Sequence, residues 1–199
     1  MYPGLVATAV KSSGTHERIL RTTLDLIGRE GIGAVTNRRV ASAAGISLGS
    51  LTYHFGSQNE LLRESLLLLI GEEIARLEGL RGDLRSRRPD LVAVANEIER
   101  FFEHSDDRVR RLAELELHLH AARDPELREA SARVFEAYEA VAITGLEMLG
   151  VDEAPARARA LVAVMHGIAL RRFGTGAADA RGMAEALLTI VGDRRPRSR

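Results

Sequence analysis

The sequence predicts an all-α protein, and two observations carry that prediction. Helix-forming residues dominate the 199-residue chain, whereas aromatic residues make up only 4% of it and the β-branched runs typical of strands are missing. Apolar residues also recur at spacings of three and four, the period of an amphipathic helix. At 45% hydrophobic, the chain can bury a sizeable core. It contains no cysteine, which excludes disulfides, zinc knuckles and thiol chemistry.

Glycine and hydroxyl residues divide the first part of the chain into an arm and three helices. Residues 1–14 are predicted to form a flexible arm, because they are small, contain Pro3 and end in Ser-Ser-Gly. The helices are expected from the N-cap Thr15 to Gly31, from about 37 to 44 behind the N-cap Thr36, and from about 48 to 55 behind the N-cap Ser47.

Further amphipathic helices are expected in the rest of the chain. A long one begins at Gln58, after the capping box of Ser57 and Glu60, and is expected to run to about Leu80 or beyond, with the Gly82–Asp83 region and Pro89 marking its end. The others are expected at about 90–104, 107–122, 125–149, 155–173 and 178–191, with a charged tail at 193–199.

The first three helices have the layout of a helix-turn-helix motif, in which the second short helix enters the DNA major groove. Small residues at the start of that helix, Ser47, Gly49 and Ser50, let the main chain approach phosphate closely. Leu51 and Phe55, four apart, can pack inward. The other face carries hydroxyl and imidazole groups that can contact phosphates or base edges, namely those of Ser50, Thr52, Tyr53 and His54.

Charge does not decide between this motif and an ordinary solvated helical hairpin. The formal net charge of the chain is zero, so a case for nucleic acid must be local. Residues 1–62 carry six basic against four acidic residues, a small excess. From layout and charge alone, both interpretations stay open.

The segment TNRRVASAAGISLGSLTYHFGSQNELL resembles the DNA-binding domain of TetR-family (tetracycline-repressor-type) transcriptional regulators, as does the preceding RILRTTLDLIGREGIGAVT. The resemblance implies a homodimer on double-stranded DNA, with a helix-turn-helix domain at 15–62. By position it implies DNA contacts from Thr36, Arg38, Ser47, Gly49, Ser50, Thr52, Tyr53, His54 and Gln58.

Three positions depart from the family pattern. Leu48 and Gln58 stand where lysine is usual, and both changes remove a positive charge near phosphate. Thr52 stands where tyrosine is common, so base preference should differ. With few cationic contacts, we expect operator binding to depend weakly on salt concentration.

The resemblance further implies that residues 63–192 form a helical domain that dimerises and holds a ligand. Apolar and small residues form stripes on the helices expected at 125–149 and 155–173, and two such helices from each protomer would make a four-helix interface. The same stripes would also suit an intrachain core. The residues expected at the dimer interface are Val134, Tyr138, Val141, Gly145, Leu161, Met165, Gly167, Ile168 and Arg172.

A ligand pocket is expected among aromatic, histidine and methionine side chains, with plain core packing as the alternative. Within ELELHLH, Glu114 and His118 are four apart, as are Glu116 and His120, but the two pairs face different sides of one helix. We therefore expect a salt-linked helix surface and no metal site. The pocket candidates are Phe101, Phe102, His104, His118, Phe135, Tyr138, Met165 and His166.

These features predict a ligand-responsive transcriptional regulator, a repressor by the family's default, that binds a palindromic operator as a homodimer and is released by a small-molecule effector. The alternative is a helical ligand- or protein-binding module that no longer reads DNA specifically. No enzyme and no cofactor are expected, because the glutamate and histidine spacing of a di-iron bundle, a serine elbow and a phosphate-binding glycine loop are all missing from the sequence. The longest apolar run, 66–70, is shorter than the ~20 residues of a membrane span, so we expect a cytoplasmic protein without a membrane partner.

Overall fold

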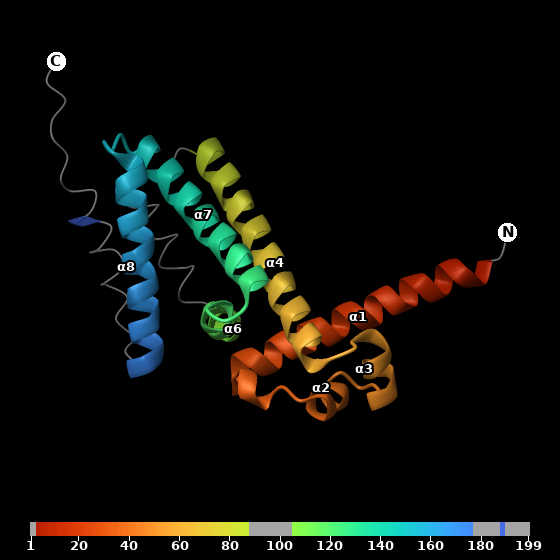
Figure 1. The fold of residues 1–199 in the computed structure, drawn as a ribbon. Coiled ribbons are helices and arrows are strands. Elements are labelled where there is room, and N and C mark those ends of the chain that lie inside the picture. Colours follow the sequence, from red (N-terminus) through yellow and green to blue (C-terminus); the bar gives the residue numbers. More distant parts are fainter. Residues whose placement is uncertain (1–2, 88–104, 177–187, 190–199) are drawn as a thin grey trace, which may run out of the picture. The chain divides into compact units, whose positions relative to one another are not determined.

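The computed structural model describes residues 3–87, 105–176 and 188–189, and every regular element among them is a helix (Figure 1). The all-α prediction is confirmed. The elements are α1 (Pro3–Glu30), the short 3₁₀-helix η1 (Ile32–Ala34), α2 (Asn37–Ala43), α3 (Leu48–His54), α4 (Gln58–Arg87), α6 (Ser105–Ala121), α7 (Pro125–Met148) and α8 (Ala154–Thr175).

The chain divides into two compact units. The first comprises Met1–Glu72 and Arg108–Ser131, and the second comprises Glu73–Asp107 and Ala132–Arg199. Both α4 and α7 continue from one unit into the other. The units differ from the domains expected at 15–62 and 63–192, because most of α6 and the first turns of α7 pack with the N-terminal helices.

In the first unit, α1, α2, α3 and the start of α4 form the helix-turn-helix head. Ile19, Val40, Leu51 and Leu61, one from each helix, are at most 1% exposed. Burying one such side chain stabilises a fold by about 1.5–3 kcal/mol. Gly31, where α1 was expected to stop, has a φ of 84°, which favours glycine over any L side chain.

The first helix differs from the prediction at its start. α1 begins at Pro3, so Thr15 lies inside the helix and residues 3–14, expected as an arm, are helical. Proline is favoured in the first turn of a helix, so Pro3 suits the start of α1. Gly14 and the serines before it lower helix propensity, but by much less than a proline inside a helix would, so the helix can continue through them. The flexibility of this segment stays a prediction.

The long helix α4 runs past Gly82 to Arg87, within the end region expected between Gly82 and Pro89. Gly79 and Gly82 both lie within α4, and a Cβ added at either would meet no atom within 4 Å. These glycines therefore lower the helix propensity of the segment but do not end the helix. The helices expected at 90–104 and 178–191 lie outside the described residues, apart from the helical residues 188–189.

In the second unit, α7 and α8 enclose a core of their own. Leu146, Val151, Ala154, Ala158 and Leu161 are buried together, and partly buried residues, Met165 and Leu84 among them, pack against this core. None of the described helices has the length and apolar character needed to cross a membrane.

Candidate nucleic-acid interface

Hydroxyl groups cap both short helices of the head, as the sequence predicts. The Oγ1 of Thr36 accepts a hydrogen bond from the backbone N–H of Arg39 at 3.2 Å, at the start of α2. The Oγ of Ser47 accepts one from the N–H of Ser50 at 3.1 Å, at the start of α3. Such caps satisfy backbone donors that a helix start leaves unpaired. Each hydroxyl proton stays available to donate, for example to a phosphate oxygen.

Helix α3 has one packing face and one exposed face. Leu51 is 1% exposed and the C-cap Phe55 3%, whereas Tyr53 is 84% exposed. The Oγ1 of Thr52 donates to the carbonyl oxygens of Leu48 and Gly49. The exposed face therefore presents a phenol, a threonine oxygen that can accept, and an open backbone at Gly49.

Two of the expected DNA contacts interact within their own chain. His54 is half-buried, and its ring lies edge-on to Tyr53 with centroids 5.5 Å apart. The side-chain amide of Gln58 donates to the carbonyl oxygen of Val35, beside η1. This bond explains how glutamine fits at the start of α4, since it ties that start to the connector before α2.

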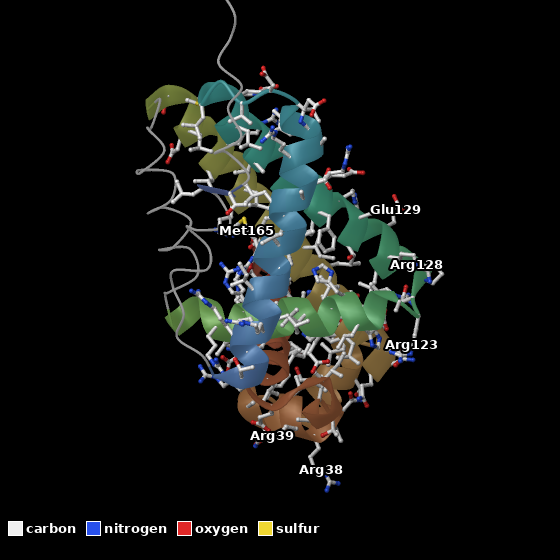
Figure 2. All side chains as sticks on the ribbon, turned by 90° about the vertical axis from the view of Figure 1, so that its left-hand side faces the viewer. Arg38, Arg39, Arg123, Arg128, Glu129 and Met165 are labelled. Carbon is white, nitrogen blue, oxygen red and sulfur yellow. The ribbon has the colours of Figure 1, made fainter. Side chains whose placement is uncertain are left out.

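Adjacent arginines on α2 differ in their partners. Arg39 pairs with Glu30 of α1, whereas Arg38 has no ion-pair or hydrogen-bond partner among the described residues. Figure 2 shows Arg38 pointing outward from α2. A guanidinium without an internal carboxylate is suited to bind a phosphate of DNA.

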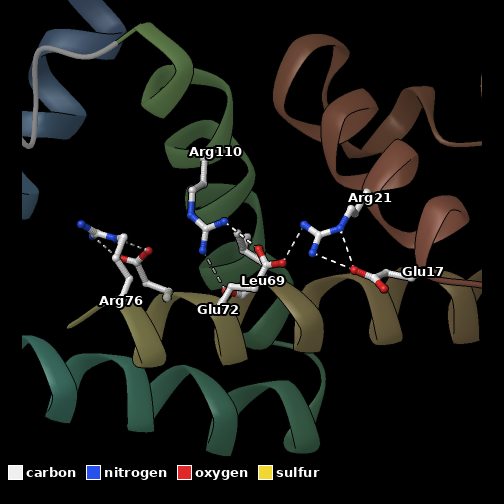
Figure 3. A network of polar contacts seen from close by, with 7 residues as sticks. Glu17, Arg21, Leu69, Glu72, Arg76 and Arg110 are labelled. Atoms are coloured by element: carbon white, nitrogen blue, oxygen red, sulfur yellow. Dashed lines mark hydrogen bonds and ion pairs between the residues drawn. The ribbon is translucent and has the colours of Figure 1, made fainter. Parts of the chain in front are cut away.

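Behind the reading surface, one carboxylate joins three helices of the first unit (Figure 3). Glu72 of α4 places Oε1 2.7 Å from Nη1 of Arg21 on α1, and Oε2 2.9 Å from Nη1 of Arg110 on α6. The hydrogen bond to Glu17, together with the charge of Glu72, raises the pKa of Arg21 above its ordinary value. The sequence analysis missed Glu72, because a glutamate inside an amphipathic helix carries no sign of its partners.

The ligand-pocket candidates do not form one group in the structure. Phe101, Phe102 and His104 lie outside the described residues. His118 belongs to the first unit, where its Nδ1 lies 2.8 Å from the Oγ of Ser131.

In the second unit, three of the remaining candidates lie together. The ring of His166 lies 5.1 Å from that of Phe135 and 5.0 Å from that of Tyr138. The Tyr138 hydroxyl donates to Oε1 of Glu73 at 2.6 Å, and this glutamate is only 4% exposed. Glu73, which pairs with Arg76, is a buried charge that the sequence analysis missed. Met165 packs against the α7–α8 core instead.

The residues expected at the dimer interface differ in how far they are buried within their own chain. Val134, Tyr138 and Leu161 are buried within their own chain, at 1%, 8% and 3% exposure, so they belong to the intrachain core. Gly145 is also buried, Gly167 is exposed, and Val141, Met165, Ile168 and Arg172 are half-buried. The opposite face of α8 is exposed although it is small and apolar, and it consists of Ala160, Ala163, Val164, Gly167 and Leu170.

The ELELHLH segment brings one glutamate and one histidine together on α6. Nε2 of His118 lies 3.9 Å from Oε1 of Glu114, four residues earlier. Among the described residues, no three histidine, aspartate or glutamate side chains are grouped as metal ligands.

Comparison with known proteins agrees with this architecture. The family model described as "Bacterial regulatory proteins, tetR family" matches residues 19–65, and the model described as "Tetracyclin repressor-like, C-terminal domain" matches residues 86–194. An uncharacterised HTH-type transcriptional regulator of Bacillus subtilis is 32% identical over 93 residues, which are 45% of this chain. The match covers 32% of that regulator, so the chain spans about a third of the length of this curated relative.

Solved structures match over nearly the whole chain. The multidrug binding protein EbrR in complex with imidazole is 29% identical, with a TM-score of 0.68 over 92% of this chain and 98% of that one. EbrR complexes with ethidium, proflavin and malachite green also match. A transcriptional regulator from Rhodococcus sp. Rha1 is 25% identical, with a TM-score of 0.73 over 91% and 99% of the two chains. Because one family model matches more than half of the chain and the other matches its helix-turn-helix, the chain belongs to the TetR family of bacterial transcriptional regulators.

Proposed function

We propose that the protein is a ligand-responsive repressor that binds a palindromic operator as a homodimer and releases it when a small molecule binds. The observation that carries the proposal is the division of α3 into two faces. Leu51 and Phe55 fix the helix in the head, while Tyr53 is 84% exposed and carries a polar tip. A rigid helix with an exposed polar face is what major-groove reading requires.

On this proposal the head residues divide by role. Arg38 and the hydroxyls of Thr36 and Ser47 bind phosphates, which sets the register without reading sequence. Tyr53, His54 and Thr52 face the bases. Gly49 and Ser50 keep the start of α3 narrow enough for a close backbone approach. Gln58 contributes by fixing the start of α4, through its bond to Val35.

The exposed face of α8 supports dimerisation. Val164 and Leu170 are 40% and 59% exposed, and small residues between them leave room for a second helix to approach. An isologous contact through this face would present two reading heads to two half-sites about one helical turn apart.

We infer an aromatic cation as the class of effector. EbrR has been solved with ethidium, proflavin and malachite green, which are aromatic cations. In this chain, the buried carboxylate of Glu73 lies beside Tyr138, and the rings of Phe135 and His166 provide further aromatic surface. A cation is attracted both to a carboxylate and to aromatic faces. A ligand that favours one tilt of α4, which continues into the head, would weaken operator binding ~5–150-fold for a coupling of ~1–3 kcal/mol.

Selection of binding sites from a random pool of duplex DNA tests the proposal. The wild-type dimer should enrich a two-fold symmetric motif, and ethidium or proflavin should release that duplex in the same concentration range in which the dye binds the protein. Enrichment of no motif by a folded dimer would contradict DNA reading and favour a binding module that no longer reads DNA. If the protein enriches a symmetric motif but neither dye releases the duplex, the proposed effector class is wrong and the proposed DNA binding stands.

A further inference from the structure

We propose that His16 of α1 is a positioning residue for operator reading, acting through His54 of α3. The inference rests on the proposed DNA-binding function. It gives a role in that function to a residue of α1, outside the two helices α2 and α3 of the helix-turn-helix. The proposal depends on three contacts that the structure gives this one imidazole.

The His16 ring is fixed in position by two neighbours. It stacks on Phe55, with centroids 4.7 Å apart and an interplanar angle of 27°. Its Nε2 lies 3.1 Å from Oε2 of Glu64 on α4. Stacking defines the plane of the ring, and the contact with the carboxylate defines its rotation within that plane. The imidazole is thus held between α3 and α4 while remaining 34% exposed.

The fixed ring in turn meets the last residue of α3. Its centroid lies 5.9 Å from that of His54, in an edge arrangement at 69°. His54 then lies edge-on to Tyr53, at 5.5 Å and 78°. A series of ring contacts therefore runs from α1 to the exposed Tyr53 of α3.

Helix α3 needs such support because it is short. It has seven residues and ends at Phe55, whose backbone is already extended with φ −133° and ψ 119°. A helix of this length is not stable by itself, so its last turn depends on tertiary packing. The contact with His16 restricts the rotamers of His54 on the side opposite to DNA, which lowers the entropy lost when His54 meets a base edge.

The titratable groups that the structure places against His16 are His54 from α3 and Glu64 from α4. An ion pair forms with Glu64 when His16 is protonated. A neutral His16 with its proton on Nε2 still donates to the same carboxylate, so the position of the ring survives loss of the charge. The positioning role therefore depends on the stacked ring more than on the charge of His16.

A double-mutant cycle in DNA affinity tests the proposal. A duplex selected by the wild-type protein from a random pool is titrated with wild type, His16→Ala, His54→Ala and the double variant, and a scrambled duplex measures non-specific binding. We expect His16→Ala to weaken binding to the selected duplex on the order of fivefold, since contacting residues couple by about 0.5–3 kcal/mol. The affinity of His16→Ala for the scrambled duplex should equal that of wild type. In the His54→Ala background, removing His16 should cost nothing further.

Two further variants separate positioning from stability. His16→Phe keeps the stacked ring and should retain affinity within about twofold, since most of the coupling between neighbouring rings would survive. Glu17→Ala changes the adjacent residue, whose partner is Arg21, and should leave the affinity unchanged.

The outcomes separate this inference from the proposed function. Equal losses on both duplexes, or losses that add fully in the double variant, would overturn the positioning role of His16 while leaving DNA reading intact. Selection of no duplex by wild type would overturn the proposed function and the positioning role together.

Discussion

Gly28 of α1 lies directly against Val109 of α6, so that a Cβ at residue 28 would stand 2.1 Å from the Val109 carbonyl oxygen. Helix α6 can approach α1 this closely because residue 28 has no side chain. The Glu72 carboxylate ties the same region together, since it pairs with Arg21 and Arg110. The first unit therefore combines the head with α6, and the contact depends on one glycine.

Gly28→Ala should destabilise the protein. The added methyl would meet backbone, which cannot rotate away, so the helices must separate at a cost of about 1–3 kcal/mol, as for other overpacked sites. Gly14→Ala, on the same helix, is the matched control, because a Cβ there meets no atom and should stabilise the helix by up to about 1 kcal/mol. Denaturant unfolding would measure both. Equal stability of the two variants would contradict the close contact.

Arg38→Ala should weaken binding to any duplex and reduce the slope of log affinity against log salt by about one, as expected for the loss of one phosphate contact. Arg39→Ala is the control, because that guanidinium already pairs with Glu30 and should contribute less to the slope. Anisotropy titrations at several salt concentrations would measure the slopes. An unchanged slope for Arg38→Ala would show that this arginine does not bind phosphate.

The wild-type slope itself should be shallow. Leu48 and Gln58 stand in the sequence where the family usually has lysine, and several arginines of the head pair internally, Arg21 and Arg29 among them. Each phosphate neutralised contributes about −0.9 to the slope. A wild-type slope as steep as about −8 would mean that further cations, such as Lys11 or the arginine-rich tail, also bind DNA.

Asp124 should make stability depend on acid pH. Burial alone would raise the pKa of this carboxyl, but the backbone N–H of Leu127, the Arg63 guanidinium and the backbone N–H of Glu126 together hold the pKa below its ordinary value. Its contribution is therefore present above the unfolded pKa of about 3.9 and is lost as pH falls through the lower folded value.

The variant that tests this is Asp124→Asn, which keeps an oxygen able to cap α7 and removes the ion pair with Arg63. It should lower the free energy of unfolding at pH 7 by up to about 1 kcal/mol, and the difference from wild type should vanish in acid. Asp152→Asn is the control, since that exposed carboxylate has no hydrogen-bond partner among the described residues. A difference that grows larger in acid than it is at pH 7 would contradict the sign of the pKa shift.

Introducing charge on the exposed face of α8 should break the dimer. Val164→Glu and Leu170→Glu would each bury a carboxylate against its symmetry copy, which is strongly unfavourable. Leu119→Glu serves as the comparison, because Leu119 is also an exposed leucine, at 64%, but lies on α6. Sedimentation would report a dimer for wild type and Leu119→Glu, and a monomer for the α8 variants. Dimeric α8 variants would place the interface elsewhere.

The sequence predicts local structure well where one residue decides it. The caps at Thr36 and Ser47 and the stop at Gly31 depend on short-range geometry, and the structure confirms all three. The start of α1 was harder to predict, because a glycine and two serines inside a helix are unfavourable without being prohibitive.

Partners far apart in the chain could not be predicted from periodicity. An apolar stripe shows that a helix face is covered, without showing whether the same chain or a second copy covers it. On α8 the chain buries Leu161 and leaves Val164 exposed, a difference that the apolar pattern does not show. Likewise, nothing in the sequence joins His16 to Glu64 or Glu72 to Arg110, because only the packing of α1, α4 and α6 brings them together.

Titration of the protein into the intergenic DNA upstream of its own gene, followed by anisotropy, tests the central claim most directly. Wild type and Tyr53→Ala would be compared at two salt concentrations, with folding and oligomeric state checked for both. Tight, sequence-dependent binding by wild type that Tyr53→Ala loses is the predicted result, because Tyr53 is 84% exposed on α3. Sequence-dependent binding that survives unchanged in Tyr53→Ala would contradict the claim that the exposed face of α3 reads DNA.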